Sequence, residues 1–341
     1  MSFMPTWRNS GHDQEDVVIS TRIRLARNLK DHCFPGKMNK EEAQAVENQI
    51  VAGAEHLPME YAHQKLSRMD KNDAKVLMEH HLISPELIKQ REISSYFLRE
   101  DQRINLMVNE EDHLRLQVLT GGLNLEDSYR LASVTDDILS ESLDYAFSLD
   151  YGYLTACPTN VGTGLRASLM VCLPGIVANN QLKSWIDSLG KLGVIVRGMY
   201  GEGSGVYGDM YQISNQRTLG FKEEDMIGKL SSMMKNLLQE EREYRNLILE
   251  RKGHLWVEDR VYRSLGLLSH ARTMEEKEAI NHLSNLRLGI SLNMYSGKTL
   301  EEIDEMIFHV GHASIAQYQE RLNTDMRIEA LRAYYLRKSF I

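Results

Sequence analysis

Three consecutive carboxylates followed by a nearby arginine are the pattern in this sequence with the clearest chemical potential. They lie in the run Val108-Asn109-Glu110-Glu111-Asp112-His113-Leu114-Arg115. If a helix begins at this run, Arg115 comes one turn after Glu111 on nearly the same face, so opposite charges are held close together. Acidic residues are also favoured in the first turn of any exposed helix by the helix dipole. The run alone therefore leaves open a charged site and an ordinary solvated helix start.

Three further segments combine arginine with glycine or small polar residues. They are Ser20-Thr21-Arg22-Ile23-Arg24, Cys157-Pro158-Thr159-Asn160-Val161-Gly162-Thr163-Gly164-Leu165-Arg166 and Arg197-Gly198-Met199-Tyr200-Gly201-Glu202. Residues 17 to 25 alternate apolar and polar side chains like a half-buried strand, which places Arg22 and Arg24 on one face. Two neighbouring guanidinium groups indicate a polyanionic ligand. For any single arginine, a surface salt bridge is the ordinary alternative.

Together, in this order and with this spacing, the four segments resemble the motifs of the phosphagen (guanidino) kinases over residues 17 to 245. Within that family the chain looks most like the bacterial protein-arginine kinases. The resemblance implies an α+β, glutamine-synthetase-like catalytic domain, in which helices flank an antiparallel sheet, and an additional all-α domain after it. The expected division is a flexible N-terminus at 1–16, a catalytic domain at 17–252 and a helical dimerisation and regulatory domain at 253–341.

The resemblance assigns roles on the acceptor side of the reaction. A guanidinium group has a pKa above about 12, so at neutral pH it is a poor nucleophile until a base accepts its proton. The family pattern gives this role to Glu111, and it makes Glu202 a second glutamate that grips the planar acceptor through charge-assisted hydrogen bonds. Cys157 lies next to the reaction centre in the family and tunes activity without a covalent intermediate. A buried structural thiol is the alternative for Cys157.

On the nucleotide side, phosphoryl transfer needs positive charge around the phosphates, because its catalysis is mostly positioning and electrostatics. The resemblance implies ATP with bridging Mg²⁺ and no separate protein metal site. His81 resembles the position beside the adenine, although His80 is adjacent. The positions assigned to ATP are Ser20, Thr21, Arg22, Ile23, Arg24, His81, Arg115, Arg166, Ala167, Ser168, Leu169, Met170, Arg197, Gly198, Met199, Tyr200 and Gly201.

The C-terminal region holds a partial match to a family motif that binds phosphoarginine, of pattern R-D-x-x-R-A. The match is Ile328-Glu329-Ala330-Leu331-Arg332-Ala333, in which Ile328 and Glu329 replace the arginine and the aspartate. Glu329 and Arg332 are therefore the candidate phosphoarginine-binding residues of an altered pocket. Arg332 could instead form an ion pair within the helical bundle.

Composition narrows the class of protein. The net charge of −8 argues against a nucleic-acid partner, because phosphate binding needs a concentrated basic surface. Three cysteines are too few for a disulfide framework, and they show no zinc-type spacing, which favours a reducing cytoplasm. The longest apolar run, residues 169 to 177, contains a proline and a glycine and is too short to cross a membrane. We expect a cytoplasmic protein with basic protein targets.

Hydrophobic periodicity predicts the elements that position these residues. Helices are expected at 40–56, 70–80, 126–147, 181–191 and 222–251, with a further helix opened by Ser84 and Pro85. Strands are expected at 17–25, 94–98, 103–108, 165–173, 193–197 and 207–214. Residues 258 to 341 show apolar residues at helical spacing and predict a helical bundle.

Other kinase and nucleotide motifs are excluded by context. The letters Gly203 to Gly208 fit G-x-G-x-x-G, but they lead into a strand rather than opening a helix, so a Rossmann site is rejected. No P-loop and no H-R-D or D-F-G element occurs. The sequence thus favours an ATP-dependent protein-arginine kinase. A kinase of free arginine or another small guanidine is the alternative, and a non-catalytic phosphoarginine adaptor is a third class.

The family resemblance implies partners as well as a reaction. It implies protein substrates with exposed arginines, a role in stress response and protein quality control, and marking of proteins for a Clp-type protease. It also implies a heat-shock repressor as a target, a zinc-binding activator protein and a homodimer.

Overall fold

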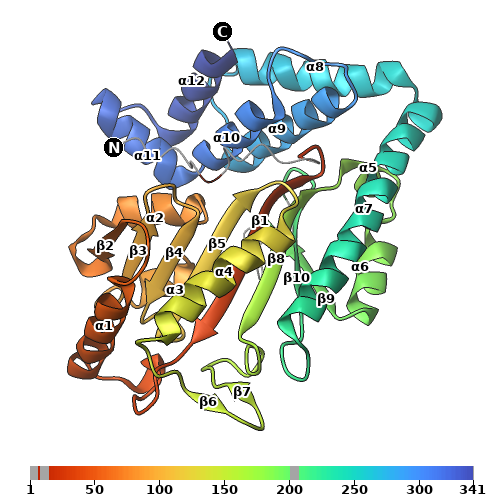
Figure 1. The fold of residues 1–341 in the computed structure, drawn as a ribbon. Coiled ribbons are helices and arrows are strands. Elements are labelled where there is room, and N and C mark those ends of the chain that lie inside the picture. The colour runs from red at the N-terminus through yellow and green to blue at the C-terminus, as the bar shows by residue number, and fades with distance from the viewer. Residues whose placement is uncertain (1–6, 8–14, 200–206, 341) are drawn as a thin grey trace. The chain divides into compact units, whose positions relative to one another are not determined.

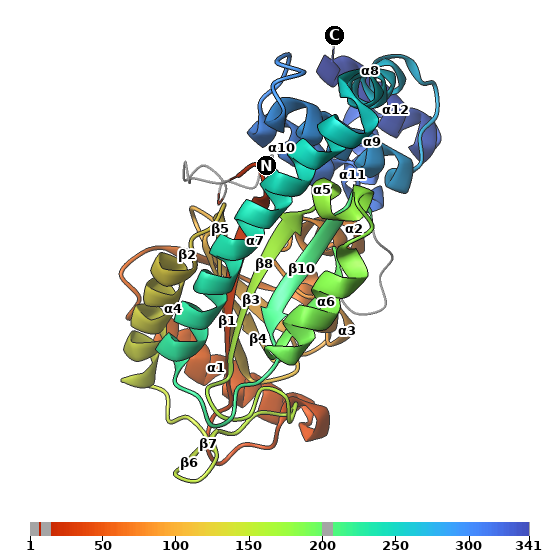
Figure 2. The ribbon, with the colours of Figure 1, turned by 90° about the vertical axis from the view of Figure 1, so that its right-hand side faces the viewer.

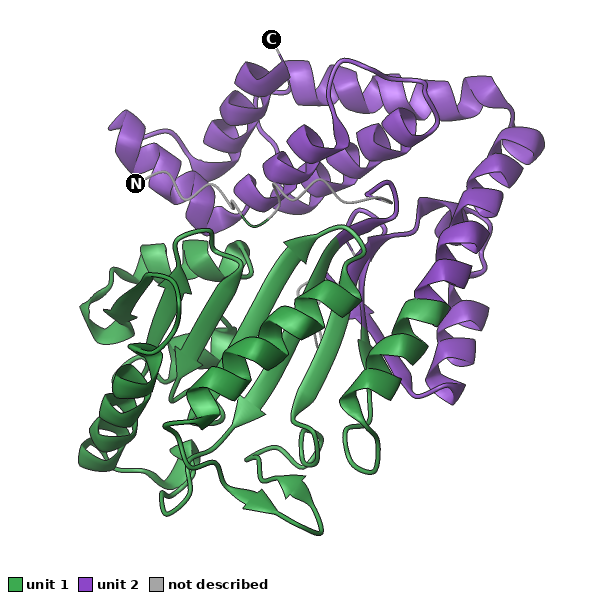
Figure 3. Cartoon of the chain, viewed as in Figure 1, with its two compact units in different colours: residues 1–12, 20–169, 214–232 green, residues 13–19, 170–213, 233–341 purple. Residues whose placement is uncertain are grey.

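The computed structural model describes residue 7 and residues 15–199 and 207–340. The chain forms two compact units, which Figure 3 shows in different colours. The first unit comprises residues 1–12, 20–169 and 214–232, and the second comprises 13–19, 170–213 and 233–341. This division differs from the predicted boundary at residue 253, which coincides instead with a break between two helices. The division at 17–252 and 253–341 stays a prediction.

An eight-stranded sheet runs through the described part of the chain in the order β2-β3-β4-β5-β1-β8-β10-β9 (Figure 1). The strands are β1 (Val18–Arg27), β2 (Tyr61–Lys65), β3 (Ser95–Arg99), β4 (Ile104–Val108), β5 (Leu114–Gly121), β8 (Leu165–Cys172), β9 (Val194–Gly198) and β10 (Met210–Asn215). A separate short hairpin is formed by β6 (Phe147–Ser148) and β7 (Gly152–Tyr153). The strands predicted from the sequence are confirmed, as is the antiparallel sheet with flanking helices.

The two faces of β1 differ as the alternation of its residues predicts. Ile23 and Leu25 are almost fully buried on one face. On this face lies α4 (Leu125–Ser140), and the Arg27 guanidinium donates to Asp136 of that helix at 2.7 Å. Figure 2 shows α4 lying along the sheet. Arg22 and Arg24 lie on the opposite face, because antiparallel pairing with β5 sets Arg22 opposite Leu119 and Arg24 opposite Gln117.

Three further helices of the first unit each begin after a residue whose side chain caps the helix, and the cap at Ser84 was predicted from the sequence. They are α1 (Lys40–Ala54), α2 (Lys71–Glu79) and α3 (Pro85–Lys89). The side chain of Asn39 caps α1, Asp70 caps α2, and Ser84 caps α3 by accepting a hydrogen bond from the Leu87 N–H. The prediction for 126–147 was too long, because α4 ends at Ser140 and the chain then enters the β6–β7 hairpin.

The second unit is mainly helical apart from its strand segments. Its helices are α5 (Pro174–Ala178), α6 (Leu182–Lys191), most of α7 (Glu223–Lys252), α8 (His254–His270), α9 (Glu276–Ser291), α10 (Leu300–His309), α11 (His312–Leu322) and α12 (Ile328–Phe340). Gly253 separates α7 from α8 with a φ of 87°, a conformation that favours glycine. Arg287 and Asp304 form a buried ion pair between α9 and α10 at 3.0 Å. The predicted C-terminal helical bundle is confirmed.

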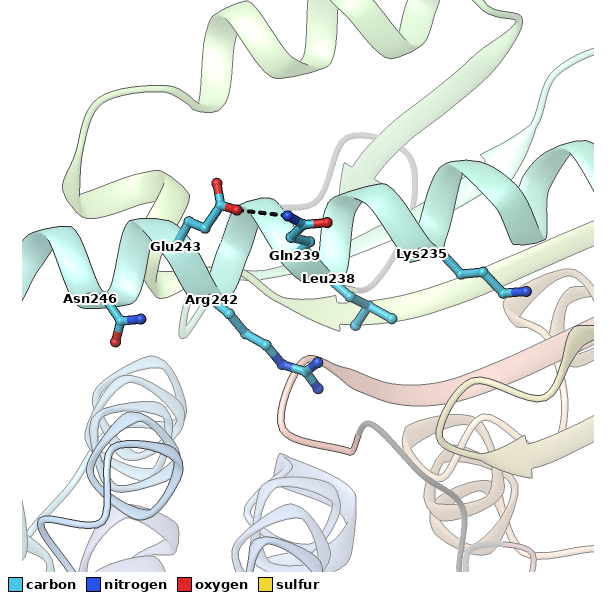
Figure 4. Close-up of a pocket in the computed structure, with 6 residues that line it drawn as sticks. All are labelled: Lys235, Leu238, Gln239, Arg242, Glu243 and Asn246. Atoms are coloured by element: carbon cyan, nitrogen blue, oxygen red, sulfur yellow. Dashed lines mark hydrogen bonds between the residues drawn. The ribbon is translucent and has the colours of Figure 1, made fainter.

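The residues before β1 are tied to α7. Asp16 accepts hydrogen bonds from Arg242 at 2.6 Å and from Arg245 at 3.1 Å. Arg242 also lines a shallow hollow of about 300 Å³ along α7, where Gln239 donates to Glu243 (Figure 4). Asp16 is therefore held in place, while most of the N-terminal segment predicted to be flexible lies outside the described residues. Within the described ranges, none of the helices is long and apolar enough to traverse a bilayer.

Candidate active site

The acidic run forms a tight turn between β4 and β5 instead of a helix start. Asn109 has a φ of 55°, and its N–H donates to the His113 carbonyl at 2.9 Å. The Asn109 side chain donates to the carbonyls of Ala43 and Ile93 at 2.9 and 3.1 Å, which anchors the turn to α1 and to the chain before β3. The expectation of a helix at this run was wrong, because the two strands on either side pair with each other and the turn closes their hairpin.

Arg115 joins the first two acids of the run. Its guanidinium donates to Glu110 at 2.7 Å and to Glu111 at 2.8 Å. The predicted proximity of Arg115 and Glu111 is therefore present, although the hairpin brings it about. Burial lowers the pKa of Arg115, but the carboxylates of Glu110, Asp112 and Glu111 outweigh it and raise the pKa overall. Arg115 is thus a permanent cation that orients two carboxylates.

The two glutamates differ sharply in exposure. The Glu110 side chain is completely buried and also accepts a hydrogen bond from the Ser84 hydroxyl and one from the Glu111 N–H at 3.1 Å. The Glu111 side chain is 39% exposed. Of the two, only Glu111 can meet an incoming substrate. Ser84 and Glu110 were not predicted as site residues, although Ser84 was predicted as a helix cap.

Asp112 connects the turn to the segment that carries Cys157. Its Oδ1 accepts hydrogen bonds from the Asn28 side chain and from the Ala156 N–H, both at 2.7 Å. Burial raises the pKa of Asp112 despite these two hydrogen bonds. Asp112 was not predicted as a site residue, and the signal for it in the sequence is its place at the end of the acidic run. Cys157 therefore directly follows Ala156, whose backbone N–H is held by Asp112 of the acidic turn.

Cys157 is half-buried, and its Sγ lies 3.0 Å from the Thr159 hydroxyl oxygen. A fully buried thiol is instead found at Cys172, whose pKa is raised to about 11 by burial. All three cysteines are free thiols.

Four arginines of the first unit lie together on the face of the sheet opposite α4: Arg22, Arg24, Arg115 and Arg166. Arg22 donates to the Ser168 hydroxyl and Arg166 to the Ser214 hydroxyl, both at 3.4 Å. Burial lowers the pKa of Arg22 to about 10, with further contributions from Arg166 and Arg115. Burial also lowers the pKa of Arg24 well below its usual range, with contributions from Arg22, Arg115 and Arg166. Such mutual repulsion marks a concentration of positive charge suited to a polyanion. We call this group the arginine cage.

His81 lies beside the cage. It has a φ of 60°, and its carbonyl accepts a hydrogen bond from the Gln117 side chain at 2.9 Å. Burial, followed by the charge of Arg22, lowers the pKa of His81 to about 3. The imidazole is therefore neutral at physiological pH. Gln117 was missed by the sequence analysis.

Other predicted nucleotide positions are spread over both faces. The side chains on the face opposite the cage are those that alternate with the cage residues: Thr21, Ile23, Ala167 and Leu169. On that face the Thr21 hydroxyl donates to the Gly122 carbonyl at 2.6 Å. Ser20 shares the cage face of β1, and Met170 is a buried residue of β8.

The remaining positions lie in or beside β9. Arg197 and Gly198 are half-buried at the end of that strand, and Met199 is buried after it. Tyr200, Gly201 and Glu202 lie outside the described residues. The proposed second acceptor glutamate therefore stays a prediction.

The C-terminal motif is built into the helical bundle. The Arg332 guanidinium is buried and donates to the carbonyls of Val310 and Met274 at 2.7 and 2.9 Å. The Glu329 carbonyl accepts from the Met274 N–H at 3.0 Å, and its carboxylate lies 3.6 Å from Arg327. Arg332 therefore ties the residue that ends α10 to the connection between α8 and α9.

Comparison with protein families accounts for nearly the whole chain. Residues 42–244 match the model of the ATP:guanido phosphotransferase C-terminal catalytic domain, and residues 254–341 match the model of the protein-arginine kinase McsB C-terminal domain. The chain is 41% identical to a protein-arginine kinase of Clostridium novyi over 97% of this chain and 96% of that protein. It is 41% identical to a protein-arginine kinase of Halalkalibacterium halodurans over 97% and 94% of the two chains.

Solved structures show the same fold. A lombricine kinase superposes with a TM-score of 0.61 and 25% identity over 70% of each chain. The duplicated taurocyamine kinase of Schistosoma mansoni has a TM-score of 0.61 and 23% identity, covering 80% of this chain and 40% of that one.

Proposed function

Since the chain belongs to the protein-arginine kinases of the ATP:guanido phosphotransferase family, we propose that Glu111 is the base that activates the acceptor arginine. The enzyme transfers a phosphoryl group from ATP to arginine side chains of proteins. The observation that supports the role of Glu111 is its environment: it is 39% exposed and oriented by Arg115, whereas Glu110 is sealed behind it.

The acceptor side works by orientation and proton removal. The substrate guanidinium enters with its positive charge, and the Glu111 carboxylate accepts a hydrogen bond from it. As the new N–P bond forms and the bond between the terminal phosphorus and the bridging oxygen breaks, Glu111 takes the proton from the attacking nitrogen. Glu202 is proposed as the second carboxylate of the clamp. Cys157 is proposed to border the same centre, on the segment that Asp112 holds.

The nucleotide side works by charge. The arginine cage is proposed to bind the ATP phosphates, with Arg197 and the segment from Gly198 to Gly201 as further contacts, and His81 beside the adenine. We propose that Mg²⁺ accompanies the nucleotide, where it would supply positive charge that offsets the charge developing on the phosphates. The cage side chains are cationic and cannot be its ligands, so phosphate oxygens and water would hold the ion, as Mg²⁺ commonly prefers. Among the described residues, no group of three or more His, Cys, Asp or Glu side chains forms a metal cluster.

The cellular context is proposed from the family resemblance. We propose a cytoplasmic enzyme of protein quality control that marks proteins for Clp-type proteolysis, with a heat-shock repressor as a target and a zinc-binding activator. Three free thiols are consistent with a reducing compartment. Glu329 and Arg332 remain the proposed phosphoarginine contacts. Arg332 fits this role poorly, because its guanidinium already donates to two backbone carbonyls.

The test compares acceptors directly. The enzyme is incubated with ATP and Mg²⁺ and with either an unfolded basic protein or free arginine, and phosphoarginine is detected by mass spectrometry under conditions that preserve the acid-labile bond. We expect modification of protein arginines in the wild type and none in Glu111→Gln. Turnover of free arginine alone would overturn the assignment of a protein substrate.

A further inference from the structure

An exposed cup of aromatic side chains lies in the first unit, on the face of the sheet opposite the arginine cage. It has a volume of 420 Å³ and is lined by the rings of Tyr129, Phe147, Tyr151, Tyr153 and Phe221. Phe147, Tyr151 and Phe221 are 55%, 57% and 46% exposed. The Phe147 and Tyr153 rings meet edge to face at 5.2 Å between centroids. Large aromatic residues gathered at such exposure usually mark a binding surface. We call this site the aromatic cup.

The walls of the cup are attached to the segment that carries Cys157. The Tyr153 N–H donates to the Gly162 carbonyl at 2.8 Å, and the Thr218 hydroxyl donates to the Val161 carbonyl at 2.7 Å. Gly152 lies so close to Gly162 that an added Cβ would come within 2.5 Å of the Gly162 carbonyl oxygen. The hairpin and the segment before α7 are thus both built onto the 157–164 segment, which borders the acidic turn through Ala156.

The cup has the chemistry of a guanidinium receptor. Three carboxylates line it, from Asp150, Glu223 and Glu224, against the single ammonium group of Lys222. The Tyr129 hydroxyl lies 2.8 Å from a carboxylate oxygen of Glu223 and 3.3 Å from one of Glu224, and Glu223 is also 3.9 Å from Arg27. Asp150 and Glu224 are exposed, whereas Glu223 is half-buried. The molecule already uses this combination internally: the Arg27 guanidinium lies 3.6 Å from the centroid of the Tyr153 ring and is paired with Asp136. Arginine stacks on aromatic faces while its planar fork binds carboxylates.

We propose that the aromatic cup is a docking site for an unfolded protein segment and binds a second arginine of the same substrate whose first arginine is phosphorylated at Glu111. The inference rests on the proposed function, since it concerns where the protein substrate is held. The negative rim fits a basic segment, and the exposed rings fit the apolar side chains that an unfolded protein displays. Because an extended peptide spans about 3.3 Å per residue, a spacer of about ten residues can bridge two subsites up to about 33 Å apart.

The test uses two synthetic unfolded peptides of about twenty residues, long enough to bridge separate subsites. Both carry one acceptor arginine, and a position about ten residues away holds either a second arginine or alanine. The second arginine is expected to lower the KM about tenfold with little change in kcat, as one desolvated anchor can. Phe221→Ala and Glu224→Gln are expected to remove this advantage and to leave turnover of the alanine peptide unchanged. Lysine at the second position is expected to restore only part of the advantage, since its ammonium group lacks the planar fork.

Met59→Ala is the matched control, because Met59 is 48% exposed in the same unit and is not a lining residue of the cup. An equal KM for the two peptides in the wild type, or an advantage that survives in both cup variants, would refute the docking site while leaving the proposed function intact. If neither peptide is phosphorylated, the proposed function itself fails. If the cup variants change the mass in solution measured by light scattering, the patch is a contact between copies of this chain and the proposal is wrong.

Discussion

Glu110 and Glu111 are neighbours in the chain, but Glu110 is part of the buried framework and Glu111 faces the substrate side. Glu110 neutralises a buried guanidinium and accepts from Ser84, whereas Glu111 shares Arg115 from an exposed position. Removing one partner of a buried ion pair leaves an uncompensated charge, while removing an exposed partner has little effect on folding.

We therefore predict opposite effects of the two alanine substitutions. Glu110→Ala should lower the free energy of unfolding by about 3 to 5 kcal/mol. Glu111→Ala should abolish phosphoryl transfer with ATP binding retained and stability almost unchanged. Urea unfolding followed by fluorescence, together with turnover and nucleotide titration, checks both. Normal turnover in Glu111→Ala would remove the base assigned here.

The arginine cage holds like charges together in the absence of a nucleotide. The lowered pKa values of Arg22 and Arg24 show that each is destabilised by burial and by its neighbours. Binding residues that are destabilised in this way typically lower the free energy of unfolding while they serve the function of the site.

Arg24→Gln should consequently raise the free energy of unfolding of the nucleotide-free protein, because one repulsive charge is gone. The same substitution should weaken ATP binding about tenfold to a hundredfold, the loss expected for a charge-assisted hydrogen bond. Thermal unfolding with and without ATP measures both effects in one experiment, and Arg103→Gln, on the strand-joining turn, is a control outside the cage. A variant that loses stability without ATP would contradict the repulsion argument.

At the scale of elements, Asp112 couples the β4–β5 turn to the Cys157 segment. One carboxylate oxygen receives both the Asn28 side chain and the Ala156 N–H. Asp112 and Ala156 are 44 positions apart in the sequence, and their hydrogen bond brings the acidic run and the Cys157 segment together in the site.

Asp112→Ala should lower kcat about tenfold to a hundredfold, the effect of a small displacement of positioned groups. The KM for ATP should stay close to that of the wild type, because three of the four cage arginines lie on β1 and β8 and not on the strands that the turn joins. Asp112→Asn keeps the accepting oxygen and should retain more activity than alanine. Steady-state kinetics of the two variants decide the point, and equal losses in both would show that the negative charge, not the hydrogen bond, is what matters.

For the whole molecule, the proposed homodimer has a candidate surface on α8. Leu255 and Tyr262 are 78% and 47% exposed and lie seven residues apart, so they occupy one face of that helix. Trp256 and Leu267, 40% and 43% exposed, extend the apolar area around the helix. Such a surface favours burial against a second copy.

We predict that Leu255→Glu combined with Tyr262→Glu yields a folded monomer. Sedimentation velocity measures the mass, and circular dichroism establishes that the helices persist. Leu192→Glu, at a leucine outside α8 that is 48% exposed, is the control and should leave the oligomeric state unchanged. A dimer that persists in the α8 variant would place the interface elsewhere.

Much of the framework was readable from local pattern. The capping residue Ser84 located the start of α3, and strand alternation put Arg22 and Arg24 on one face, because both effects depend on neighbours within a few positions. The order of four motifs indicated the family and the chemistry. The helix predicted at 126–147 was too long, because α4 ends at Ser140 and the chain continues into the β6–β7 hairpin.

The sequence by itself thus determined which residue types are present, their periodicity and the reaction to which they are suited. Only the tertiary structure decided which glutamate is buried, that Asp112 holds Ala156, and that five aromatic rings from α4, the β6–β7 hairpin and the segment before α7 form one cup. The physical reason is that burial and partner choice depend on segments far apart in the chain. Side-chain periodicity specifies a face, but it does not specify what packs against that face.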